Sequence, residues 1–270
     1  MSSKPASRSA PAPSRPEHLE SLERGLRVLA LFGTDGVHQF TMAEVAERLD
    51  ITRASAMRVL GTLESLGFIH ATGRSFRLGV RVLDLGYAYL SSLGFAAVSK
   101  PIVEALVEET GETCSIGVLD EQDIVYVVRV EARRIVRIDL SVGSRLPAYI
   151  NSMGRLLLGT LVDDELDAYL SKLQPTAVTS RTVTDRKELK QRILATRRTG
   201  WCYIDGEVEA RVAGLSVPLR DRESRAMAAL NITVMNRPRS RREVEKELLP
   251  RLRQAATEIE AILCNGLEVD

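Results

Sequence analysis

Apolar residues between residues 17 and 67 repeat at three- and four-residue spacing, which predicts three successive helices. Thr41, followed by Glu44 three residues later, matches a capping box and marks the start of the second helix. Thr52 is a good N-cap for the third helix, and Gly67 is placed to end it as a C-terminal glycine does. The first helix is predicted ahead of Gly33 from the apolar positions Leu22, Leu26, Leu29 and Ala30.

Two short strands are predicted after the third helix, at residues 68–71 and 75–78, with a turn at residues 72–74 between them. Helix, helix, short turn, helix and hairpin is the order of a winged helix-turn-helix domain. In DNA-binding domains of the helix-turn-helix type, the second helix of the motif lies in the major groove. The sequence therefore predicts an all-α winged helix-turn-helix DNA-binding domain over residues 17–78.

The third helix has two different sides when its residues are placed about 100° apart on a helical wheel. The side that would face the core consists of Ala56, Val59, Leu60 and Leu63. The outer side is small, polar and basic, which lets a helix enter the groove and lets hydroxyl and guanidinium groups reach base edges and phosphates. Residues 51–80 contain four Arg and no Lys, and Glu64 is their only acidic residue. We predict DNA contacts from Thr52, Arg53, Ala54, Ser55, Arg58 and Thr62 of this helix and from Arg74 and Arg77 of the wing.

Residues 79–94 are predicted to form a linker helix that also pairs with a second copy of the chain. It contains more apolar residues than a connector exposed on all sides would have. These residues are Val82, Leu83, Leu85, Leu90 and Leu93. We therefore expect a homodimer or a dimer of dimers.

From residue 95 onward the pattern mixes helices and strands, which predicts an α+β domain with an antiparallel sheet over residues 95–270. Helices are expected at residues 95–109, 155–161, 163–173, 185–199 and 243–263. Strands are expected at residues 113–119, 124–130, 135–140, 201–205, 214–219 and 228–235.

Length and composition agree with two globular domains, since the chain has 270 residues, 44% of them hydrophobic. Lys and Arg number 37 and Asp and Glu 36, so a chain that is basic throughout is excluded, but a local DNA-binding surface is not. No apolar run is long enough to span a membrane. The odd number of cysteines (Cys114, Cys202 and Cys264) favours reduced, buried thiols in a cytoplasmic protein. Residues 1–16 are rich in Ser, Ala, Pro and Arg, which predicts a disordered basic tail.

The sequence does not contain the residues and motifs that common enzyme active sites require. The three histidines, His18, His38 and His70, lie outside the α+β domain, which therefore has no histidine base or ligand. The sequence contains no nucleophile elbow, phosphate-binding loop, dinucleotide fingerprint or C-x-x-C pair. We predict that the protein is not an enzyme and that it holds no metal and no cofactor.

The order of a winged helix, a linker helix and an α+β domain resembles the IclR family of bacterial transcription regulators. Four local patterns carry the resemblance: residues 21–29 (opening helix), residues 52–63 (recognition helix), residues 76–79 (end of the wing), and Leu146-Pro147 with residues 152–158 (effector pocket). Residues 207–218 depart from the family, since Gly214 stands where a Ser or Cys often lines the pocket. Residues 137–154 look most like regulators of aromatic-acid breakdown, in the protocatechuate, 4-hydroxybenzoate and β-ketoadipate routes.

The resemblance implies a GAF- or profilin-like effector-binding domain. Asn151, Ser152 and Met153 begin a helix whose free amides and positive dipole end suit a carboxylate. Arg145 is an alternative anion contact. Thr113 and Ser115 share one face of a strand, as do Asn231 and Thr233. The predicted effector-binding residues are Thr113, Ser115, Leu146, Asn151, Ser152, Met153, Gly154, Asp205, Gly214, Ser216 and Asn231, with Asp205, Gly214 and Ser216 taken from the resemblance.

The sequence thus predicts a ligand-responsive regulator that binds double-stranded operator DNA, a small carboxylate and a second copy of itself, and RNA polymerase if it is an activator. Three alternatives stay open. The effector could be a non-aromatic acid such as glyoxylate or pyruvate. The chain could be a small-molecule enzyme with a fused DNA-binding domain, or a protein-binding module that never touches nucleic acid.

Overall fold

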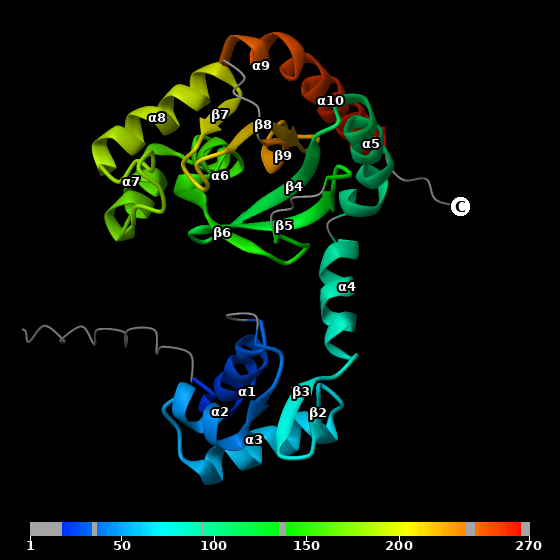
Figure 1. Ribbon diagram of the computed structural model, residues 1–270, viewed down its shortest axis with the longest axis vertical. Helices are drawn as coiled ribbons and strands as arrows, with labels where there is room; N and C mark the ends of the chain where they lie inside the picture. Colours follow the sequence, from blue (N-terminus) through cyan, green and yellow to red (C-terminus); the bar gives the residue numbers. More distant parts are fainter. Residues whose placement is uncertain (1–17, 34–36, 93, 135–138, 236–240, 266–270) are drawn as a thin grey trace, which may run out of the picture. The chain divides into compact units, whose positions relative to one another are not determined.

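The computed structural model describes residues 18–33, 37–92, 94–134, 139–235 and 241–265. The predicted tail at residues 1–16, the first part of the predicted strand at residues 135–140 and the side chain of Cys264 lie outside the described set. The chain divides into two compact units, Met1–Ala88 and Tyr89–Asp270, which we describe separately (Figure 1).

The first unit is a winged helix-turn-helix, as predicted. Two caps of the predicted type begin its second and third helices: Thr41 forms a complete capping box with Glu44, and the Thr52 hydroxyl accepts a hydrogen bond from the Ser55 amide. A short strand, which the sequence did not suggest, adds to the wing and gives an antiparallel sheet in the order β1-β3-β2. The elements are α1 (Glu20–Leu31), β1 (Phe40–Thr41), α2 (Met42–Arg48), α3 (Arg53–Ser65), β2 (Ile69–Thr72) and β3 (Ser75–Leu78).

The first helix exists where predicted, but its most regular apolar residues are not in the core. Val28 is buried within the unit, whereas Leu22 and Leu26 are 59% and 58% exposed. Helix α4 (Val82–Ser92) also has no buried residue, and Leu83 and Leu85 are exposed on it. Both helices therefore leave apolar surface uncovered within one copy of the chain.

The second unit has a six-stranded antiparallel sheet in the order β6-β5-β4-β9-β8-β7, with helices on both faces. Helices α5 and α10 cover one face, and α6, α7 and α8 lie on the other (Figure 1). Each face has its own apolar cluster, so the sheet is buried on both sides. The strands are β4 (Thr113–Asp120), β5 (Asp123–Val130), β6 (Arg145–Pro147), β7 (Cys202–Asp205), β8 (Val212–Arg220) and β9 (Ala226–Met235). The helices are α5 (Phe95–Thr110), a 3-10 turn (Ala148–Ile150), α6 (Ser152–Leu158), α7 (Asp163–Lys172), α8 (Arg186–Thr199), α9 (Arg241–Glu247) and α10 (Leu249–Asn265).

Two predicted elements differ from the structure. The strand expected at residues 135–140 does not continue through residues 139 and 140, and the edge strand is instead β6, which pairs with β5. The C-terminal helix predicted as one piece is two, α9 and α10. The break falls at Leu248, just before Pro250, which has no N–H to donate to the carbonyl of Lys246 in the preceding turn.

Among the described residues no single helix is long and apolar enough to cross a membrane, and only α4 and α5 taken together as a bent pair meet that length and composition.

Candidate functional site

The outer face of α3 carries most of the residues predicted to bind DNA. Arg53, Ala54, Arg58 and Thr62 are exposed on it, and Thr52 is exposed just before it. The Thr62 hydroxyl donates to the Arg58 carbonyl at 2.8 Å and still lies on the surface.

Ser55 is a correction to the predicted DNA-binding face. Its side chain is buried and accepts a hydrogen bond from Arg24 of α1 at 3.3 Å. It stands at the edge of the helical wheel, where the approach of a neighbouring helix decides whether a residue is covered. Met57, which the sequence analysis passed over, is 63% exposed and lies between Arg53 and Gly61 on the outer face. The helical wheel places Met57 on this face from the sequence alone, but an apolar side chain there does not by itself indicate a DNA contact.

The wing presents Arg74 and Arg77 to solvent. Gly73 takes a positive φ of 64° in the turn, a conformation that favours glycine, and Arg74 follows it. Arg77 stands opposite His70 in the β2–β3 pair. Across the part of the chain that the structure describes, no ion pair occupies the guanidinium groups of these two residues or of Arg53 and Arg58. Such unpaired cations are what DNA phosphates attract.

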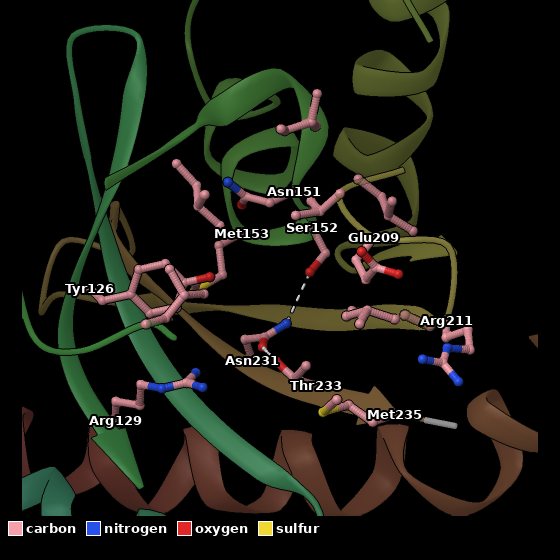
Figure 2. A pocket seen from close by; sticks show the side chains of 18 residues that line it. Tyr126, Arg129, Asn151, Ser152, Met153, Glu209, Arg211, Asn231, Thr233 and Met235 are labelled. Carbon is pink, nitrogen blue, oxygen red and sulfur yellow. Dashed lines mark hydrogen bonds between the residues drawn. The ribbon is translucent and has the colours of Figure 1, made fainter. Parts of the chain in front are cut away.

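The second unit contains a cavity of about 470 Å³ between its sheet and α6, within the usual range for small-molecule sites. Figure 2 shows side chains reaching it from β5, β9 and the start of α6, with Glu209 and Arg211 from the loop before β8. The predicted residues that line it are Leu146, Asn151, Ser152, Met153, Gly214 and Asn231.

A buried hydrogen-bond network joins α6 to the sheet at this cavity. Asn231 Nδ2 donates to Ser152 Oγ at 3.0 Å and approaches Ser216 Oγ at 3.1 Å. Ser152 Oγ and Ser216 Oγ share a hydrogen bond at 2.7 Å, and Thr233 donates to Asn231 Oδ1 at 2.8 Å. Ser216 takes part in the network behind the cavity wall and is not among the lining residues. The network fixes Ser152 against the sheet.

Gly214 lies on the cavity wall, and its lack of a side chain is needed for close packing. A Cβ atom there would lie 2.6 Å from Ser152 Oγ and 3.3 Å from Asn231 Nδ2. The missing side chain thus lets the α6 serine approach β8.

The backbone amides at the start of α6 are not all free to bind a ligand. Asn151 Oδ1 accepts the Gly154 amide hydrogen at 2.7 Å, so the side chain caps this amide. Gly154 is buried against the backbone of Ala148 and does not line the cavity. Its role is close packing, and the prediction that this amide is free for a carboxylate is wrong.

Four other predicted contacts lie away from the cavity wall. Asp205 is exposed and paired with Arg181 at 2.7 Å, and Thr113 Oγ1 accepts the Ala132 amide hydrogen at 3.1 Å. Arg145 is held at the surface by Asp120 at 2.7 Å and by Asp123. Ser115 is fully buried beneath the lining. Strand alternation gives the face on which a residue lies, but it does not give the neighbour that occupies its polar atoms.

Arg129 is a charged lining residue that the sequence analysis did not predict. Its side chain is only 6% exposed, and its guanidinium donates to Ser115 Oγ at 3.3 Å. The guanidinium carbon lies 6.0 Å from the centre of the Tyr126 ring. The signal was present, since Arg129 is the one charged residue in the otherwise apolar run of residues 124–130. A charge in a strand that is buried on both faces needs a reason.

Tyr126 lies beside Arg129 on the same wall (Figure 2). Burial raises the pKa of Tyr126 to about 12, so its hydroxyl stays protonated at neutral pH. Burial likewise raises the pKa of Cys202 and of Cys114 to about 12. Both thiols are therefore neutral at neutral pH, and a neutral thiol is a poor nucleophile.

A buried ion pair anchors the loop at the cavity mouth. Glu207 Oε1 and Oε2 accept from Arg155 at 2.8 and 2.5 Å, and Arg192 approaches the same carboxylate at 3.3 Å. The Val183 amide donates to Glu207 Oε2 at 3.1 Å. Val208 and Arg211, which follow Glu207 in the same loop, line the cavity. Glu207 therefore connects this loop to both α6 and α8.

A winged helix with unpaired arginines and a second unit with a ligand-sized cavity together define a ligand-responsive transcription regulator. Comparison with known protein families identifies which family of regulators the chain belongs to. Residues 21–73 match the model of the IclR helix-turn-helix domain, and residues 87–261 match that of the bacterial transcriptional regulator IclR C-terminal domain. The chain belongs to the IclR family.

Individual relatives agree with this assignment. The Pca regulon regulatory protein of Pseudomonas putida is 37% identical over 256 residues, which cover 94% of this chain and 88% of that protein. The Pca operon regulatory protein of Acinetobacter baylyi is 31% identical over 92% of this chain and 90% of its own length. The crystal structure of an IclR homolog from Microbacterium hydrocarbonoxydans, complexed with 4-hydroxybenzoate, is similar with a TM-score of 0.80 at 27% identity and covers 92% of this chain and 100% of that one.

Proposed function

We propose that the protein controls genes for the breakdown of aromatic acids and that its effector is a small aromatic carboxylate. The observation that carries the proposal is the cavity in the second unit. Its lining is mostly apolar and includes the aromatic ring of Tyr126, and polar side chains such as Arg129, Ser152 and Asn231 are present to orient a ligand. The names of the two Pca regulators and the 4-hydroxybenzoate complex of the Microbacterium homolog support this choice of ligand.

On this proposal, the effector binds at Leu146, Asn151, Ser152, Met153, Gly214 and Asn231. The operator is read by Arg53, Ala54, Arg58 and Thr62 of α3, with Thr52 at its N-terminus and Arg74 and Arg77 of the wing on the backbone or minor groove. The protein acts in the cytoplasm, as a homodimer or a dimer of dimers, so that two winged helices meet two half-sites. If it is an activator, the DNA-bound form also contacts RNA polymerase.

The effector works by binding more tightly to one of two states that differ in operator affinity or polymerase contact. No turnover of the ligand is expected on this proposal, because none of the described residues that line the cavity is a histidine, cysteine or lysine.

The test is thermal unfolding of the full chain with 4-hydroxybenzoate, protocatechuate, β-ketoadipate, glyoxylate and pyruvate, followed by operator binding with each ligand that stabilises the protein. A specific effector raises the melting temperature by mass action and changes operator affinity. A response to glyoxylate or pyruvate alone would show that the aromatic assignment is wrong. Chemical conversion of the bound ligand would instead indicate an enzyme.

A further inference from the structure

Arg129 is a buried cation in an otherwise largely apolar cavity. A guanidinium has five N–H donors, and among the described residues Arg129 donates one hydrogen bond, to Ser115 Oγ. Its Nε is buried and has no hydrogen-bond partner in the same set. Glu131, which is partly exposed, lies 3.5 Å from this nitrogen and supplies charge without a hydrogen bond. A buried donor without a partner is costly, so the protein retains Arg129 there at the expense of stability.

The surroundings hold the guanidinium in place and leave it facing the cavity. In the sheet, Ser115 stands directly opposite Arg129 on one side and Asn231 on the other. The Tyr126 ring adds a contact on β5, and Figure 2 shows the guanidinium reaching toward Asn231 along the cavity floor. The donor group is therefore fixed before a ligand arrives, which reduces the entropy lost on binding.

The other arginines near the cavity do not have this combination. Arg211 lines the cavity but is exposed, so water satisfies it. Arg155 is buried, but Glu207 and the Tyr149 carbonyl occupy its guanidinium. Arg145 lies at the surface between two aspartates. Among the described arginines, Arg129 is thus the one that is buried, lines the cavity and has donors to spare.

We propose that Arg129 binds the carboxylate of the effector and is the residue that makes the site select acids over neutral analogues. Ser115 is a positioning residue that orients the guanidinium from behind. The inference rests on the proposed function, because it assumes that the cavity takes an aromatic acid. It assigns the anion contact to a strand side chain in place of the helix amides.

The experiment compares two probes of one shape, 4-hydroxybenzoate and 4-hydroxybenzamide, by calorimetry on the full chain. Wild type should bind the acid at least about 10-fold more tightly than the amide, since hydrogen bonds to a charged group are the stronger ones. Arg129→Met keeps an unbranched, flexible stem and removes the guanidinium with its charge. It should weaken acid binding about 10- to 100-fold and leave amide binding within about threefold, so that the preference for the acid disappears.

Two further variants keep the test decisive. Arg129→Lys retains a cation without the planar fork and should keep part of the preference for the acid even if Arg129→Met does not fold. Arg145→Met removes an exposed arginine away from the cavity and should change neither affinity. Wild type that binds amide and acid equally, or an Arg129→Met that keeps the preference, would overturn the inference. Failure of wild type to bind any aromatic acid would instead refute the proposed function.

Discussion

Replacing Glu207 by alanine should destabilise the second unit more than any change at an exposed position in the same loop. The carboxylate is buried, and it is bound by both terminal nitrogens of Arg155, by Arg192 and by the Val183 amide. Its removal leaves the buried Arg155 guanidinium without its counter-ion. Breaking a buried pair by removing one partner costs about 3–5 kcal/mol. That is a large part of the roughly 5–15 kcal/mol by which a domain is stable.

Urea unfolding followed by the fluorescence of Trp201 measures this effect. Trp201 is the only tryptophan in the sequence and is buried within the second unit, so its signal reports this unit and not the winged helix. Glu209→Ala is the matched control, because Glu209 is exposed two residues further along the loop and its loss should change stability by about 0.5 kcal/mol or less.

A double variant separates the ion pair from other effects. Arg155→Met with Glu207→Leu removes both charges, and it should be more stable than Glu207→Ala because no uncompensated charge is left. If Glu207→Ala lowers the free energy of unfolding by less than about 1 kcal/mol, or by no more than Glu209→Ala does, the reasoning that this pair anchors the loop is refuted.

Three more predictions concern the other parts of the molecule. Arg58→Ala should weaken operator binding by roughly 1–3 kcal/mol with an unchanged circular dichroism spectrum. If an anisotropy titration gives the same operator affinity as wild type, the inference that α3 lies in the major groove is wrong. Gly214→Leu places side-chain atoms against Ser152 and should abolish the response to effector while DNA binding without effector is unchanged; an unaltered response would place the pocket elsewhere. Sedimentation at micromolar concentration should give a dimer or larger assembly, with Leu83→Glu shifting it toward monomer, and a wild-type monomer would contradict pairing through α4.

The parts predicted correctly from the sequence are those that depend on neighbours along the chain. The caps at Thr41 and Thr52 are local hydrogen bonds, so residue type and spacing were enough to place the helices of the winged domain. The break before Pro250 was equally local and was overlooked. By contrast, the burial of Ser55 depends on Arg24, which is 31 residues away, and no pattern within α3 contains that information.

The same distinction explains the effector site. Alternation along a strand correctly put Thr113 with Ser115, and Asn231 with Thr233, on one face each. It could not give the register across strands, which aligns Arg129, Ser115, Asn231 and Ser216 in one row over four strands. Ser115, Asn231 and Ser216, each seen alone, are ordinary polar residues in a strand, and only Arg129 stands out as a charge in an apolar run.

The row also gives a physical route from the ligand to α6. Arg129 bonds to Ser115, and Ser115 lies beside Asn231, whose amide holds Ser152 at the N-terminus of that helix. Asn231 Nδ2 has two hydrogens but lies within hydrogen-bond distance of three acceptors, Ser152 Oγ, Ser216 Oγ and the Leu215 carbonyl, so it can satisfy only two of them well at one time. Three acceptors around two hydrogens leave one acceptor poorly satisfied. On the proposed function, we infer that a ligand that adds or removes one partner at this point would change how Asn231 holds Ser152, and with it the N-terminus of α6.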